Sequence, residues 1–215
     1  MQAFHDIFAA FRTFLDDWAP VDGGSSALHR SAFQLLMRTT RLMAEHDDFP
    51  LSLLADRVDS IIAIISKLRD HHPSIFSSVF GSLLSLVHTV LSCSEETVLT
   101  QHLIGSLYET FYYTLVEHLL FTLGLPHSEQ DDDALVLSLE VCRCLTARRA
   151  EDLLTLAGGQ GDEAAAVEIL GVTFPKLRSL MGALELFLMR EQVSEELDEC
   201  VVELMETLRP ILAFD

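Results

Sequence analysis

The sequence predicts an all-α fold of about eight to nine antiparallel helices. Apolar residues, leucine above all, recur with a period of about 3.6 residues along most of the chain, and strand-like alternation is nowhere sustained. The composition, 49% hydrophobic and 22% charged with only 10 Gly and 6 Pro, favours a packed core over disorder. A chain of 215 residues is long enough for one domain or one short solenoid.

The 22 residues from Pro73 to Ser94 carry no formal charge, and we expect them to form the apolar helix around which the others pack. Its bulky face is predicted to comprise Phe76, Val79, Phe80, Leu83, Leu86, Val87, Val90 and Leu91. Small residues fill the other face, namely Ser77, Ser78, Gly81, Ser82, Ser85, Thr89 and Ser92. Both faces are expected to be buried, so an exposed Gly81 would contradict the central position of this helix. Seven serines and His88 dilute the hydrophobicity, so we do not expect this helix to span a membrane.

Residues 1–19 are predicted to form an amphipathic helix with the most aromatic face of the chain. Its anchors would be Phe4, Phe8, Phe11 and Trp18. The segment 19–26, which contains one Pro and two Gly, ends this helix and separates it from a single all-helical domain over residues 25–215. A sub-boundary could fall near 124–131. The aromatic face is either a detachable docking surface or an ordinary cap on the core.

Helices are expected next over residues 25–46, 51–70, 73–94 and 94–123. The first of them should expose Arg30, Arg38 and Arg41. In the last, the residues predicted to face inward are Leu99, Leu103, Leu107, Phe111, Leu115, Leu119 and Phe121. The three tyrosines of the chain cluster on its middle turns, at Tyr108, Tyr112 and Tyr113. They can form a binding surface, or they can pack half-buried with their hydroxyls in water.

The last third of the chain is expected to hold four or five further helices. The predicted segments run from Asp131 to about Leu145, from Ala147 to Leu156, from Asp162 to Gly171, from Pro175 to Met189, and from Ser194 onwards. The final helix should bury Leu197, Val201, Leu204, Leu208 and Leu212. Its outer face would then be acidic, with Glu199, Glu203 and Glu206.

Helix starts near 25, 51, 74 and 97 are separated by 26, 23 and 23 residues, so two successive helices span about 46 to 49 residues. In length and period, residues 25–123 resemble HEAT and armadillo repeats, whose helical hairpins stack into an α-solenoid. No repeat-specific residue signature accompanies the spacing. A compact helical bundle around the apolar helix fits nearly as well.

The distribution of charge indicates which classes of partner the protein can bind. The net charge is −19, and residues 94–215 hold 23 acidic against 7 basic side chains. This balance argues against direct binding of nucleic acids, and of anionic membranes. It favours a protein partner that is basic or presents an amphipathic helix.

No constellation of catalytic or metal-binding residues is evident, so we expect no enzymatic activity, cofactor or metal. Cys142 and Cys144 are one residue apart, which is not a zinc-knuckle spacing. The run Asp131–Asp133 is interpreted as the acidic start of a helix. Four scattered cysteines and an N-terminus without signal-peptide features predict a cytoplasmic or nuclear location.

The expected function is therefore a non-enzymatic protein–protein interaction module, a helical scaffold or an adaptor subunit of a larger complex. The alternative is an all-helical enzyme, or a carrier of a small ligand or lipid, with a buried pocket.

Overall fold

The computed structural model describes residues 111–157, 172–190 and 193–213, and single positions before them: 6, 9, 13, 31, 38, 80, 81, 83–85, 87, 88 and 91. These residues contain helices and turns and no strand, so the prediction of an all-α fold is confirmed for them. Within the same residues, no helix is both long enough and apolar enough to cross a membrane.

The chain divides into two compact units, residues 1–106 and residues 107–215. The division falls inside the helix predicted over 94–123. The turn at 124–131, where a sub-boundary was considered, lies within the second unit.

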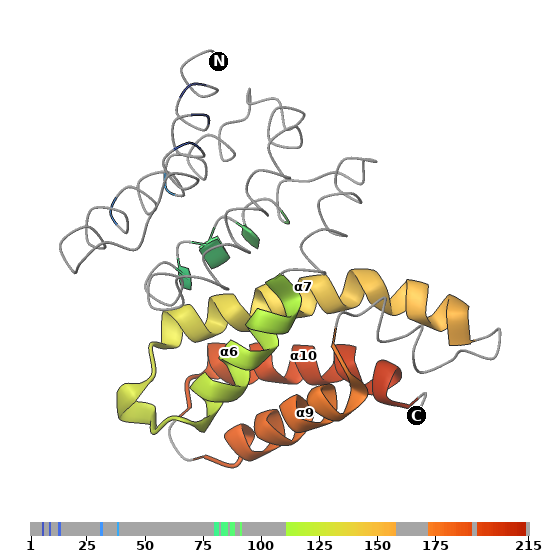
Figure 1. Ribbon diagram of the computed structural model, residues 1–215. Coiled ribbons are helices and arrows are strands. Elements are labelled where there is room, and N and C mark those ends of the chain that lie inside the picture. The colour runs from blue at the N-terminus through green and yellow to red at the C-terminus, as the bar shows by residue number, and fades with distance from the viewer. Residues whose placement is uncertain are drawn as a thin grey trace. The chain divides into compact units, whose positions relative to one another are not determined.

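In the second unit, α6 (Tyr113–Gly124) continues from a π-helical turn at Phe111 and Tyr112. A 3-10 turn, η2 (His127–Glu129), leads to α7 (Asp132–Ala157) (Figure 1). The Asp131 carboxylate accepts a hydrogen bond from the Ala134 amide at 3.2 Å, so the predicted acidic helix start is confirmed.

Two further helices complete the described part of this unit. α9 (Phe174–Leu188) begins with Pro175 in its first turn, where a missing amide hydrogen costs nothing. α10 (Glu195–Leu212) begins at Ser194, whose hydroxyl accepts a hydrogen bond from the Leu197 amide at 3.3 Å. Both starts agree with the sequence prediction.

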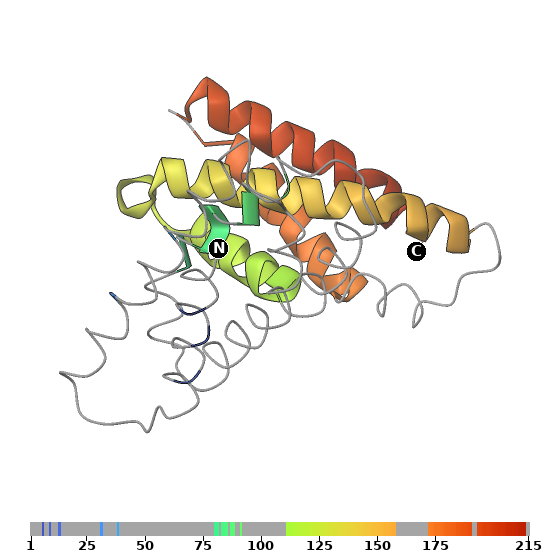
Figure 2. The same ribbon diagram turned by 90° about the horizontal axis from the view of Figure 1, so that it is seen from above.

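The four helices pack in a ring, in which each contacts two others: α6 with α7, α7 with α10, α10 with α9, and α9 with α6. Lys176 near the start of α9 pairs with Glu117 of α6, while Arg190 after α9 bonds to carbonyls at the end of α6. α6 and α9 therefore run parallel. Figures 1 and 2 show α7 and α10 also running in a common direction, opposite to α9.

The core of this ring is almost entirely aliphatic and aromatic. In α10, Leu197, Val201, Leu204 and Leu208 are buried as predicted, whereas Leu212 is half-buried. From the other helices the ring buries Leu115, Val116, Leu119, Leu123, Leu135, Leu139, Val141, Leu145, Leu177, Leu180, Leu184 and Phe187.

The end of α6 is held by side chains from elsewhere in the unit. The Gln130 amide donates to the carbonyls of Thr122 and Leu125, at 2.8 and 3.1 Å. The Arg190 guanidinium donates to the carbonyls of Leu125, at 3.0 Å, and Leu123. The Leu123 and Leu125 carbonyls at this helix end are thus satisfied by side chains, and the Thr122 carbonyl, which also accepts from the Leu125 amide at 3.1 Å, gains a second donor.

The prediction that residues 73–94 form a central helix buried on both faces is wrong, because Gly81 on the small-residue face is exposed. Gly81 is exposed, and a Cβ built on it would meet nothing within 4 Å. The bulky side is buried as predicted, at Phe80, Leu83, Val87 and Leu91, with Leu84 in addition. The described positions therefore follow an ordinary amphipathic pattern, because uncharged small residues lose little by remaining in water. The Ser85 hydroxyl donates to the Gly81 carbonyl at 3.1 Å, as expected for serine in a helix.

Two further corrections concern the second unit. α7 is one continuous helix of 26 residues, where two helices separated near Thr146 were predicted. The Thr146 hydroxyl donates to the Cys142 carbonyl at 2.6 Å, so this polar residue satisfies itself inside the helix without breaking it. Phe121 is 67% exposed and does not face inward, because it lies two residues, about 200°, beyond the buried Leu119.

Of the helices predicted before residue 111, the structure describes only single positions. Arg38 is helical and exposed, as predicted. The remaining bounds expected for 1–19, 25–46, 51–70 and 73–94, the first part of 94–123, and the helix expected from Asp162 to Gly171, lie outside the described residues.

Candidate functional site

The outward side of α10 carries a row of carboxylates, which we call the acidic face of α10: Glu195, Glu196, Glu199, Glu203 and Glu206. All five residues are exposed. The helix contains six acidic residues in all, Asp198 included, against the single basic residue Arg209. The three predicted site residues, Glu199, Glu203 and Glu206, lie on this face as expected.

The position of the face is fixed by the packing beneath it. Leu197, Val201, Leu204 and Leu208 alternate with the glutamates and are fully buried. At about 1.5 Å rise per residue, the carboxylates from Glu199 to Glu206 are spread along about 10 Å of helix. The face is therefore a line of charges opposite the buried apolar side of the same helix.

One cation reaches this face from a neighbouring helix. Arg143 of α7 forms an ion pair with Glu203, with 3.1 Å between Nε and Oε2. Both side chains are more than a third exposed, so water screens the pair and its contribution to stability is small. Glu203 is thus partly neutralised, while the net charge of the face remains negative.

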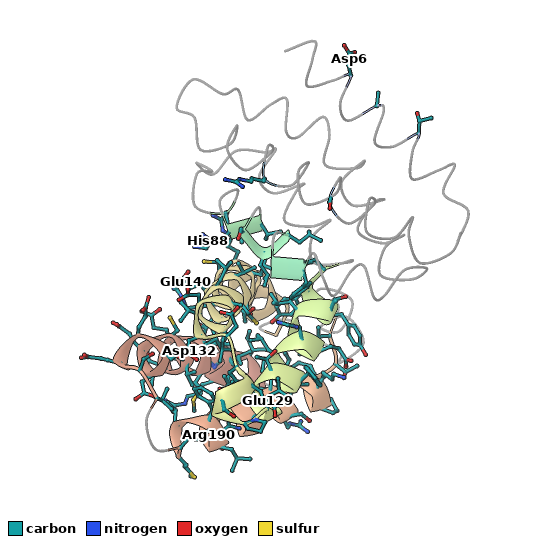
Figure 3. All side chains as sticks on the ribbon, turned by 90° about the vertical axis from the view of Figure 1, so that its left-hand side faces the viewer. Asp6, His88, Glu129, Asp132, Glu140 and Arg190 are labelled. Carbon is teal, nitrogen blue, oxygen red and sulfur yellow. The ribbon has the colours of Figure 1, made fainter. Side chains whose placement is uncertain are left out.

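The carboxylates raise the pKa of a neighbouring thiol, that of Cys200. The pKa of Cys200 is raised, first by burial and then by the negative charges of Glu140, Glu203 and Glu196, while Arg143 acts in the opposite direction. Figure 3 labels Glu140, which extends this negative region onto α7. Carboxylates of α7 and α10 therefore both contribute to the negative potential around Cys200.

Of the predicted tyrosine patch, the two described members, Tyr112 and Tyr113, do not share a surface. Tyr112 is fully buried, and its hydroxyl lies 2.7 Å from the hydroxyl of Thr146, so the expectation that it reaches water is wrong. Tyr113 is 44% exposed and has the Lys176 ammonium 5.3 Å from its ring centroid. Tyr108 lies outside the described residues. Consecutive residues on a helix point about 100° apart, which separates Tyr112 from Tyr113.

The predicted aromatic anchors Phe4, Phe8, Phe11 and Trp18 also lie outside the described residues. Three positions of the same predicted helix are described: Asp6, Ala9 and Thr13 are helical and exposed. The helical conformation expected there is confirmed at these positions, and the function of the aromatic face stays a prediction.

Exposed apolar side chains form a feature that the sequence reasoning missed. Leu186 and Met189 of the α9 region are 67% and 79% exposed, and Phe121 of α6 is 67% exposed. A signal was present for α9, because Leu186 and Met189 each lie two residues after a buried residue, at Leu184 and Phe187.

Among the described residues, no group of three or more His, Cys, Asp or Glu side chains is arranged to hold a metal ion. Comparisons with protein families, with curated proteins and with solved structures find no match for this chain.

Proposed function

We propose that the protein is a non-enzymatic interaction module, and that the acidic face of α10 is the surface that receives a basic protein partner. The observation that carries the proposal is the exposure of Glu199, Glu203 and Glu206 in one row, backed by the buried leucines of the same helix. A basic amphipathic helix presents cations with a matching helical period, so it complements this row.

The face is suited to steering and selecting a partner more than to strong binding. Exposed charges at the rim of an interface raise the rate of association and suppress partners of like charge, while each contributes only about 0.2–1 kcal/mol. Val202 is 42% exposed on the same side of α10 and supplies an apolar contact among the carboxylates. The proposed complex should therefore depend strongly on ionic strength.

A scaffold or adaptor subunit in the cytoplasm or nucleus is the setting we propose for this face. The HEAT/armadillo-like organisation of residues 25–123, and eight to nine helices in the whole chain, belong to the same proposal. Their support is the spacing of helix starts in the sequence.

The proposal is tested by affinity purification with mass spectrometry, using two variants of equal charge. The face variant carries Glu199→Gln, Glu203→Gln and Glu206→Gln. The control variant carries Glu129→Gln, Asp133→Asn and Glu185→Gln, which are exposed carboxylates outside α10. Each variant removes three negative charges, so non-specific effects of net charge are matched.

We expect at least one protein to be captured by the wild type and the control variant and lost by the face variant. That protein should contain a basic segment predicted to be helical. If every captured protein is retained by the face variant while circular dichroism shows its fold intact, the acidic face is not the binding surface. Loss of the same proteins by both variants would equally contradict the proposal, because net charge alone would then explain it.

A further inference from the structure

We draw no further inference here: the strongest candidate, the outward side of α9 with the exposed Leu186 and Met189, is an unpartnered apolar face, and nothing among the described residues shows what covers it.

Discussion

The contact between Tyr112 and Thr146 predicts an unequal response to two conservative substitutions. Both side chains are fully buried, with 2.7 Å between their hydroxyl oxygens. The Thr146 hydroxyl already donates its hydrogen to the Cys142 carbonyl, at 2.6 Å. The Tyr112 hydroxyl must therefore donate to Thr146, since the threonine has only one hydrogen to give.

Thr146→Val removes the hydroxyl that accepts the hydrogen of the buried Tyr112 phenol. We expect a loss of about 1–3 kcal/mol in the free energy of unfolding, towards the lower end if the phenol turns to the nearby Cys142 sulfur, a weak acceptor. Tyr112→Phe leaves the Thr146 hydrogen bonded to Cys142 and should cost less, about 0.5–1.5 kcal/mol. The double variant should cost clearly less than the sum of the two single variants.

Native-state hydrogen exchange of amides in α6 and α7 measures these changes in the unit that contains both residues. Thr207→Val is the matched control, because Thr207 also donates to a carbonyl one turn earlier, that of Glu203, but its hydrogen bond is exposed to solvent. It should change the free energy by less than about 0.5 kcal/mol. Additive effects of Tyr112→Phe and Thr146→Val would refute the hydrogen bond on which this reasoning depends.

Three further predictions follow from the second unit. Burial raises the pKa of the Cys142 thiol to about 12. Under native conditions at pH 8, Cys142 should therefore react with iodoacetamide more slowly than the half-exposed Cys144, as measured by peptide mass spectrometry. Equal reaction rates would contradict the burial of Cys142. Burial lowers the pKa of His118 below its ordinary value of 6.5, so His118 takes up a proton more readily in the unfolded chain than in the folded one. The free energy of unfolding should therefore decline as the pH falls from about 6.5 towards the lowered pKa. Urea unfolding at pH 7.5 and 5.5 should show a smaller acid-induced loss in His118→Gln than in the wild type, and an identical loss would contradict the shift. Arg190→Met removes the guanidinium donors from the carbonyls of Leu123 and Leu125, of which Leu125 keeps its hydrogen bond from Gln130, and should cost about 1–3 kcal/mol, measured by thermal unfolding; no change would contradict a stabilising role of these bonds.

The starts of α9 and α10 could be predicted from the sequence because the signals there are local. Proline is favoured in the first turn of a helix, and Pro175 stands there in α9. At the start of α10, the Ser194 hydroxyl accepts a hydrogen bond from a free backbone amide, and Glu195 and Glu196 place negative charge where the helix dipole favours it. The buried side of α10 could be predicted equally well, because Leu197 and the apolar residues after it repeat every three or four positions. The acidic face is the complement of that pattern.

The failures have physical causes that a single sequence does not show. Thr146 has a low helix propensity, yet it lies inside α7 because its hydroxyl bonds within its own helix and to a residue 34 positions earlier. Gly81 lies in an uncharged stretch, but the absence of charge does not predict burial, because small residues are indifferent to exposure. Tyr112 and Tyr113 are adjacent in sequence, but only their direction from the helix axis decides which one is buried.

The most direct test of the acidic face uses a defined probe, a synthetic amphipathic helical peptide of lysine and leucine carrying a fluorophore. Its affinity for the full chain, for the face variant and for the control variant is measured by fluorescence anisotropy at 50 and 300 mM NaCl. At about 0.2–1 kcal/mol for each charge, removal of Glu199, Glu203 and Glu206 should weaken binding roughly 3- to 150-fold at low salt, and the difference should shrink at high salt. The control variant should bind like the wild type. Equal affinities of the face and control variants at 50 mM NaCl would contradict the claim that this face of α10 receives a basic partner.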